Sequence, residues 1–256
     1  MDLRHPFLKF ILKSNLFISL CATGLSLETS VILKSGFQSG WLCAFVFFAT
    51  LCSYNLYYIK SSDFPYHRSM ALLGLFGSIV SLILMPSIPY VYLGIITLLS
   101  SLYLLPVFVS FRKPDSYSAL RLFMLILVWV LFTFQFPAPH HLFDWRYGLL
   151  LLYRILLLSH LCVLFFIRDE RNPSLKRTAE IALIPLGLLQ GLVCVLIMLH
   201  GDYSLSIIYL TITLLTIKVS SRSIRSSRSN FHYLLFVDGI MLLQSIFVLF
   251  KFLITP

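Results

Sequence analysis

Two polar connections carry most of the side chains in this sequence that can do chemistry. The first reads YNLYYIKSSDFPYHRS and the second reads FFIRDERNPSLKRTAEI. Each combines carboxylate, amide and cationic groups within a few residues, between long apolar runs. The candidate site residues are Asn55, Asp63, Arg68, Asp169, Glu170, Lys176 and Arg177.

This mixture of groups suits a phosphorylated ligand. Mg²⁺ takes oxygen ligands and bridges one or two carboxylates to substrate phosphates, while Lys and Arg neutralise the remaining phosphate charge. Ionisation of an allylic diphosphate requires such a clamp on the leaving group, with an apolar cavity behind it for the lipid tail. On the residues alone, ordinary solvated loops whose Lys and Arg only fix the topology are the favoured interpretation.

The composition decides the class of protein that must position these residues. The chain has 256 residues, of which 59% are hydrophobic and 12% charged, and its mean hydropathy is +0.90. Soluble domains are about half apolar and about a quarter charged, so a water-soluble fold is excluded. The net charge of +10 sits in short clusters between apolar runs rather than on one soluble face, so we expect membrane lipids and no nucleic acid as partners.

The hydropathy pattern predicts an all-α, polytopic membrane helical bundle of about nine transmembrane helices, forming a single transmembrane domain over residues 1–256. The boundary between the third and fourth segments is placed at Pro86 and Pro89, because proline breaks a helix. The predicted helices cover about 15–34, 38–58, 69–87, 90–111, 119–136, 146–167, 179–199, 203–219 and 232–254.

The distribution of positive charge predicts the orientation of this bundle. With nine spans, sixteen of the 20 Lys and Arg residues fall on the side of the N-terminus. Lys34, Arg146 and Lys251 fall on the other side, and Arg154 lies inside the sixth span. Cytoplasmic connections retain positive charge, so we predict a cytoplasmic N-terminus and a C-terminus on the opposite side.

Other residues that could carry chemistry give weaker signals. The five cysteines lie inside apolar runs without C-x-x-C spacing, so we expect them to be buried packing residues. A solvated turn is favoured over a metal site for His140, His141 and Asp144. His160 and His200 have no supporting pattern for haem ligation. Glu28 and Arg154, at matched depth in two spans, leave open either a buried ion pair or separate polar surroundings.

The chain resembles the UbiA superfamily of intramembrane prenyltransferases. The helix count, the orientation and the polar connections after helices two and six all fit this family. The stretch FVFFATLCSYNLYYIKSSD corresponds to its N-x-x-x-D-x-x-x-D motif, and IRDERNPSLKRT to its second, D-x-x-x-D-like motif. The segment F-A-T-L-x-x-Y-N resembles divergent bacterial members in particular.

The resemblance implies a Mg²⁺-dependent prenyltransferase that moves a prenyl group from a polyprenyl diphosphate to an aromatic or lipid acceptor. It also implies a bacterial inner membrane location. By the motif positions, Asp63 and Asp169 would be catalytic and hold Mg²⁺ together with Glu170. Such a clamp predicts that Asn55, Asp63 and Asp169 converge on one cytoplasmic cavity. The substrate-binding residues implied in this way are Asn55, Arg68, Lys176 and Arg177.

Two positions depart from the family pattern and support a rival interpretation. Ile59 stands at the first Asp position of the first motif, and Pro173 stands four residues after Asp169 in the second. We expect Pro173 to end any regular helix nearby, which affects how Glu170 is placed. The rival is a non-catalytic lipid-binding or transport protein that kept the bundle and lost the metal site.

Overall fold

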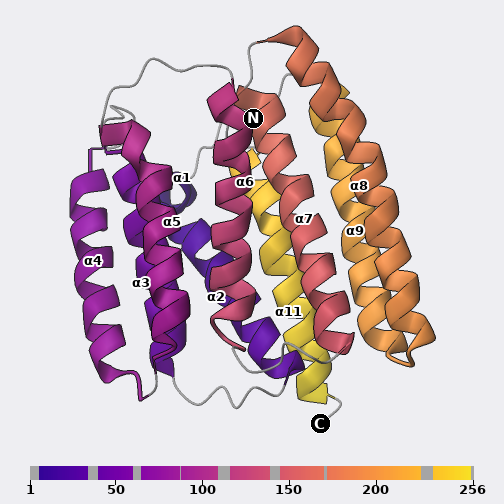
Figure 1. Ribbon diagram of the computed structural model, residues 1–256, viewed down its shortest axis with the longest axis horizontal. Coiled ribbons are helices and arrows are strands. Elements are labelled where there is room, and N and C mark those ends of the chain that lie inside the picture. The colour runs from indigo at the N-terminus through magenta and orange to yellow at the C-terminus, as the bar shows by residue number, and fades with distance from the viewer. Residues whose placement is uncertain are drawn as a thin grey trace. The chain divides into compact units, whose positions relative to one another are not determined.

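The protein is helical throughout the part described by the computed structural model, residues 6–33, 40–59, 65–86, 88–108, 116–138, 145–169, 172–225 and 233–254. No strand occurs among these residues. The helices are α1 (Pro6–Lys13), α2 (Leu16–Ile32), α3 (Gly40–Tyr57), α4 (His67–Leu84), α5 (Tyr90–Phe108), α6 (Ser116–Val130), α7 (Trp145–Asp169), α8 (Pro173–Leu199), α9 (Tyr203–Arg225) and α11 (Asp238–Ile254), with π-helical turns η1 (Leu131–Gln135) and η2 (Tyr233–Val237) (Figure 1).

Helices α2 to α9 and α11 each overlap one of the nine predicted apolar segments, and the fifth and ninth segments also include η1 and η2. Six helical stretches are long and apolar enough to cross a membrane, namely Gly40–Tyr57, His67–Leu84, Trp145–Arg168, Pro173–Leu199, Tyr203–Arg222 and Leu235–Ile254. Three shorter apolar helices cover Leu16–Ile32, Tyr90–Leu104 and Leu122–Gln135. The protein is therefore an all-helical, multi-pass membrane protein, and the count of nine spans stays a prediction.

The outward faces of the helices suit a lipid environment. Leu72, Phe76 and Ile83 of α4 are 67%, 69% and 75% exposed, and Leu188 of α8 is 71% exposed. Water disfavours such large apolar surfaces, whereas lipid tails accept them without cost. The cysteines were predicted to be buried packing residues, and four of the five are buried, while Cys43 is half-buried.

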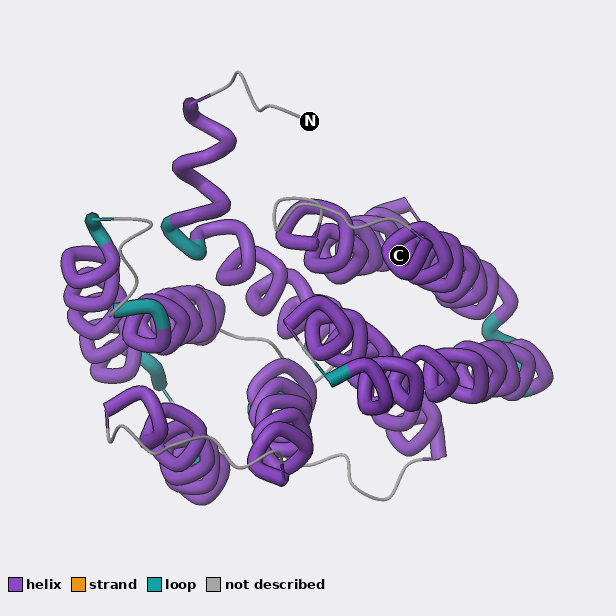
Figure 2. The backbone as a smooth tube through the Cα atoms, turned by 90° about the horizontal axis from the view of Figure 1, so that it is seen from above, coloured by secondary structure: helices purple, strands orange, loops and turns teal. Residues whose placement is uncertain are grey.

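The chain forms two compact units, unit 1 (Met1–Pro139) and unit 2 (His140–Pro256). Figure 2 looks nearly along the axes of the long helices within each unit. Glu28 is fully buried in unit 1 and Arg154 is buried in unit 2, so the proposed pair between them stays a prediction. The single domain over residues 1–256 likewise stays a prediction.

Unit 1 begins with a break that the hydropathy pattern did not predict. Asn15 has a left-handed backbone, with φ of 63°, and separates the short helix α1 from α2. The hydroxyl of Ser19 donates to the Asn15 carbonyl at 2.9 Å and so occupies a carbonyl next to the break. The hydropathy pattern cannot show the break at Asn15, because the helices on both sides of it are apolar.

Helices α3 and α4 pack backbone against backbone. A β-carbon added at Gly74 of α4 would lie 2.5 Å from the backbone nitrogen of Cys52 and 2.8 Å from the carbonyl oxygen of Phe48, both in α3. Small residues permit this approach between membrane helices, where close packing replaces the hydrophobic effect as a driving force.

The π-helical turn η1 is stabilised by hydroxyl groups of α2. Its wider winding is seen in the bond from the Phe136 amide to the Leu131 carbonyl, at 2.8 Å. The Thr29 hydroxyl contacts the Thr133 carbonyl at 2.9 Å as well as the Leu25 carbonyl of its own helix at 3.0 Å. Backbone groups at membrane depth need partners inside the protein, and Thr29 supplies one.

Unit 2 is built from α7, α8, η2, α9 and α11, in which α7 packs on α8, α8 on α9 and α9 on α11. Pro173 does not follow a helix that it terminates: α7 already ends at Asp169, and Pro173 is the first residue of α8. The side chain of Asn172 caps α8 by accepting from the Ser174 amide at 3.1 Å. Proline is favoured at this first position because its missing N–H has no helical partner there.

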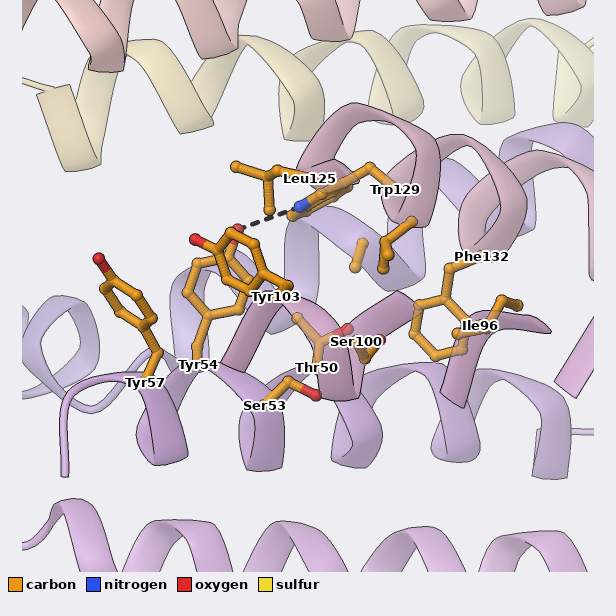
Figure 3. A pocket seen from close by; sticks show the side chains of 12 residues that line it. Thr50, Ser53, Tyr54, Tyr57, Ile96, Ser100, Tyr103, Leu125, Trp129 and Phe132 are labelled. Atoms are coloured by element: carbon orange, nitrogen blue, oxygen red, sulfur yellow. Dashed lines mark hydrogen bonds between the residues drawn. The ribbon is translucent and has the colours of Figure 1, made fainter. Parts of the chain in front are cut away.

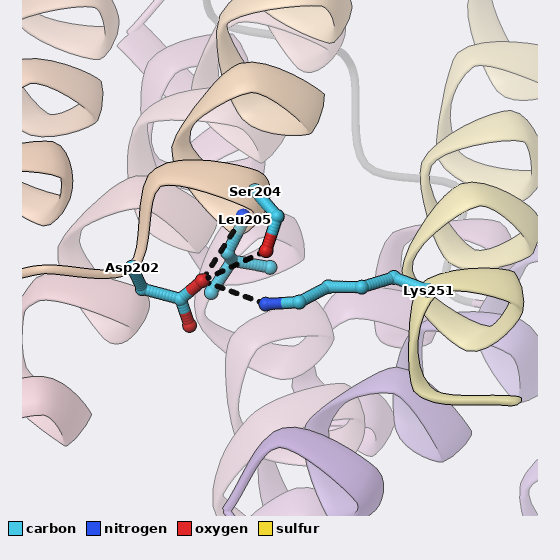
Figure 4. Close-up of polar contacts among 4 residues, drawn as sticks. All are labelled: Asp202, Ser204, Leu205 and Lys251. Carbon is cyan, nitrogen blue, oxygen red and sulfur yellow. Dashed lines mark hydrogen bonds and ion pairs between the residues drawn. The ribbon is translucent and has the colours of Figure 1, made fainter. Parts of the chain in front are cut away.

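The turn from α8 to α9 carries a charged contact with the end of α11. Gly201 has a φ of +91°, which an L-residue rarely adopts. Asp202 follows, and its Oδ1 accepts from the Leu205 amide at 3.1 Å and from the Lys251 ammonium at 2.6 Å (Figure 4). Burial opposes ionisation of Asp202, but the hydrogen bonds from Lys251 and Leu205 outweigh it and lower the pKa of this carboxyl.

Replacing Asp202 by Asn should lower the free energy of unfolding by about 0.5–1 kcal/mol near neutral pH, because the contact with Lys251 is partly solvent-exposed. Asn keeps an oxygen for the Leu205 amide, so the change isolates the charge. Since the folded pKa is depressed, this stabilisation is present above the unfolded pKa of about 3.9 and is lost as the pH falls through the folded value.

Thermal unfolding of wild type and Asp202→Asn over a pH series measures this effect. The difference between the two should shrink towards zero on acidification, while Lys251→Gln serves as the partner variant. A difference that stays constant with pH would contradict the assignment.

Candidate functional site

The predicted site residues are distributed over both units. Asn55 lies in α3 and Arg68 in α4 of unit 1, while Lys176 and Arg177 lie exposed in the first turns of α8 in unit 2. Asp63 and Glu170 lie outside the described residues. Asp169 is the last residue of α7, and only its backbone position is described. The predicted convergence of Asn55, Asp63 and Asp169 therefore stays a prediction.

Asn55 is fully buried and holds three segments of unit 1 together. Its Nδ2 donates to the Ser14 carbonyl, at the junction of α1 and α2, and to the Leu51 carbonyl of its own helix, each at 2.9 Å. Its Oδ1 lies 2.8 Å from Nδ1 of His67 at the start of α4. Both amide hydrogens are thus used inside the protein.

His67 is a site residue whose role the sequence did not reveal. Because Oδ1 of Asn55 can only accept, the ring nitrogen Nδ1 of His67 carries the hydrogen. The ring stacks on Tyr58, with centroids 5.8 Å apart and an angle of 25°. His67 begins the helix that follows the first polar connection, so the Asn55–His67 bond ties the two ends of that connection together.

An aromatic pocket lies on another face of α3. It has a volume of about 70 Å³ and is formed by α3, α5, α6 and η1, with Ala22 contributed by α2 (Figure 3). Trp129 donates from Nε1 to the Tyr54 hydroxyl at 3.0 Å, and Tyr57 stacks on Tyr103 with centroids 5.7 Å apart. Three hydroxyl groups, those of Thr50, Ser53 and Ser100, also line the pocket.

The residues of this pocket follow a pattern that is visible in the sequence. On α3 they are Thr50, Ser53, Tyr54 and Tyr57, and on α5 they are Ile96, Ser100 and Tyr103. On α6 and η1 the pattern repeats, at Leu125, Trp129 and Phe132. Spacings of three and four residues place side chains on one face of a helix. This spacing shows which positions share a face on each helix, but it does not show that the three faces meet.

The described residues contain no group of three or more His, Cys, Asp or Glu side chains that could hold a metal. His200 is exposed, its Nδ1 lies 2.7 Å from the Leu196 carbonyl, and its ring centre lies 4.0 Å from that of Trp145. His160 is buried and its Nε2 lies 2.9 Å from the Ser220 hydroxyl. The predicted Mg²⁺ ligands Asp63, Asp169 and Glu170 were not part of that set, because their side chains are not described.

Basic side chains gather at one end of unit 2. Arg168 lies near the end of α7, with its guanidinium 4.9 Å from the ring centre of Phe165 and 5.6 Å from that of Tyr233. Lys176 and Arg177 begin α8, and Arg222 lies near the end of α9. Because α8 and α9 are antiparallel neighbours, these residues share one end of the unit (Figure 1).

Comparison of the chain with protein-family models, with curated proteins and with solved structures finds no match.

Proposed function

We propose that this membrane protein is a UbiA-like prenyltransferase, which moves a prenyl group from a polyprenyl diphosphate to an aromatic or lipid acceptor. The observation that carries the proposal is the aromatic pocket of unit 1. It lies on α3, the helix that leads into the polar connection containing Asp63. An apolar cavity beside a polar connection is the arrangement that a lipid diphosphate requires.

The chemistry of the pocket lining supports a prenyl ligand. The lining is largely apolar, and the aromatic faces of Tyr54, Tyr57, Tyr103 and Trp129 can stabilise positive charge developing on an allylic carbon. A volume of about 70 Å³ is far below the roughly 300 Å³ of a typical site for a drug-sized ligand, so it accommodates only a short part of a prenyl chain.

The diphosphate would be held by the polar connections. Asp63, Asp169 and Glu170 are the residues that would hold Mg²⁺, which neutralises charge on a leaving diphosphate. Arg68, Lys176 and Arg177 would contact phosphate oxygens. In this proposal the basic connections face the cytoplasm of a bacterial cell, with nine spans across the inner membrane and a cytoplasmic N-terminus.

Lys251 is an exception to the proposed charge distribution, and it is paired with an acidic residue. Lys251 is one of the few basic residues assigned to the non-cytoplasmic side, and its charge is compensated by Asp202 at 2.6 Å. The ion pair gives the charge of Lys251 a partner on that side, while the proposed orientation is argued from the larger number of Lys and Arg residues on the opposite side.

The second candidate is a non-catalytic lipid-binding or transport protein. The geometry of Asn55 favours it, because both hydrogens of the amide are donated to the Ser14 and Leu51 carbonyls. Ile59 at a motif Asp position points the same way. The pocket would then bind an isoprenoid or another slender lipid tail without cleaving a diphosphate.

Incubation of the purified protein in nanodiscs with labelled allylic diphosphates of several lengths, with and without Mg²⁺, separates the candidates. We expect Mg²⁺-dependent diphosphate release, and a loss of at least about tenfold for Ser100→Trp, which fills the pocket. Gly94→Ala on the same helix, where an added β-carbon meets nothing within 4 Å, is the matched control. Binding without release would support the second candidate, and neither binding nor release would refute both.

A further inference from the structure

Unit 2 contains a buried polar cluster formed by residues of α7, α8 and α9. Gln190 of α8 is fully buried, and neither Oε1 nor Nε2 of its amide has a hydrogen-bond partner among the described residues. His160 of α7 is 1% exposed, and its Nδ1 has no partner there either. A buried polar atom without a partner is costly, and more so where lipid surrounds the helices.

The hydrogen-bond geometry defines which hydrogen His160 carries. Its Nε2 lies 2.9 Å from the Ser220 hydroxyl, and that hydroxyl donates its single hydrogen to the Thr216 carbonyl at 2.7 Å. The hydroxyl oxygen therefore accepts from Nε2–H of His160. A neutral imidazole has one N–H, so Nδ1 is a bare acceptor that requires a donor.

Gln190 is placed to share that donor. A β-carbon at Gly187 would lie 3.8 Å from Cε1 of His160, the ring carbon bonded to Nδ1. Gln190 follows Gly187 by three residues, and positions so spaced lie roughly 5–6 Å apart on one helix face. The Gln190 side chain therefore extends from the face of α8 that contacts the His160 ring, and a water molecule can bridge two polar groups that are too far apart for a direct bond.

The neighbouring face of α9 offers acceptors rather than donors. The hydroxyls of Thr213 and Thr216 donate to the Tyr209 and Ile212 carbonyls of their own helix, at 2.9 and 2.8 Å. Thr213 faces α8, where its Oγ1 lies 3.9 Å from Sγ of Cys194. The cluster therefore has several lone pairs and, apart from the Gln190 amide, few free hydrogens.

We propose that unit 2 binds an internal water molecule between His160 and Gln190, which donates to Nδ1 of His160 and accepts from Nε2 of Gln190. Water fits because it has two donors and two acceptors and is small enough to be enclosed by helices. The water molecule would extend the hydrogen-bond chain that runs from His160 through Ser220 to the Thr216 carbonyl, and would give Nδ1 of His160 a donor.

The sign of one stability change tests the proposal. Methionine has the shape of glutamine without its hydrogen-bonding atoms. If Gln190 holds the water, Gln190→Met leaves His160 without its donor and should lower the melting temperature by about 2–4 °C. If the amide has no partner, the same change removes a buried unsatisfied group and raises the melting temperature, which would overturn the proposal. Leu188→Met, on the exposed side of α8, is the control.

A measurement on the wild-type protein distinguishes water from a direct bond between the two side chains. In the full-length chain, labelled with ¹⁵N-histidine and reconstituted in lipid, the His160 signal is assigned by its loss in His160→Phe. We expect Nε2 to carry the hydrogen and magnetisation to pass from water to the His160 ring, with loss of that transfer in Gln190→Met and no loss in Gly191→Ala. Absence of transfer in wild type would overturn the proposal, including the case of a direct His160–Gln190 bond.

Discussion

Replacement of Gly74 by alanine should lower the free energy of unfolding by about 3 kcal/mol or more. The new β-carbon would lie 2.5 Å from the Cys52 nitrogen and 2.8 Å from both the Cys52 Cα and the Phe48 oxygen. All three are backbone atoms, which cannot rotate away as a side chain can. The helices α3 and α4 must therefore separate along their whole contact.

The matched control is Gly94→Ala in α5, where an added β-carbon meets nothing within 4 Å. That variant should be neutral or slightly stabilised, because alanine is the better helix former. Thermal unfolding in detergent and the yield of monodisperse protein measure both variants. If Gly74→Ala is as stable as Gly94→Ala, the close packing of α3 on α4 is wrong.

The Gly74→Ala substitution should also weaken ligand binding in the aromatic pocket. Helix α3 contributes Thr50, Ser53, Tyr54 and Tyr57 to the aromatic pocket. A shift of α3 away from α4 would displace these side chains relative to α5 and α6. Any residual folded Gly74→Ala protein should therefore bind a prenyl ligand more weakly than Gly94→Ala does.

The nine apolar segments were predictable because each is a long and predominantly apolar run, even where it contains a charged residue such as Glu28 or Arg154. Several helices extend beyond the predicted segments, and these differences have a common physical cause. Helix α8 begins at Pro173 rather than near 179, and α9 continues to Arg225 rather than 219. Hydropathy detects the part of a helix that suits hydrocarbon, whereas the backbone hydrogen bonds continue through the charged turns that follow.

Features that depend on contacts between helices could not be predicted from the sequence. The left-handed Asn15 and the π-helical turn η1 leave no signal in hydropathy, since both lie between apolar residues. The pocket arises where faces of α3, α5 and α6 meet, and only the helix arrangement shows that these three faces belong together. Asn55 was selected as a site residue from a motif, but the geometry reveals a second, structural role.

Asn55→Leu should lower the free energy of unfolding by roughly 3–4 kcal/mol, because leucine has about the same size but none of the hydrogen-bonding atoms. The change would remove the partners of the Ser14 carbonyl and of His67 Nδ1, both of which are buried. The side chain would also no longer link the α1–α2 junction, α3 and the start of α4. Thermal unfolding measures the loss, with the exposed Asn172→Ala, expected to cost about 1 kcal/mol as a helix cap, as a control.

Asn55→Asp separates the structural role of this residue from a role in holding a metal or a diphosphate. A carboxylate at this position would face the Ser14 and Leu51 carbonyl oxygens at about 2.9 Å, where both now accept hydrogens from Asn55. If the amide is structural, this variant is destabilised nearly as much as Asn55→Leu, and acidification recovers part of the loss because a protonated carboxyl regains one donor. If Asn55 instead acts mainly as an oxygen ligand, Asn55→Asp keeps the fold and binds Mg²⁺ and diphosphate at least as well as wild type. A stable, Mg²⁺-competent Asn55→Asp protein would therefore contradict the structural role and favour the metal-binding one.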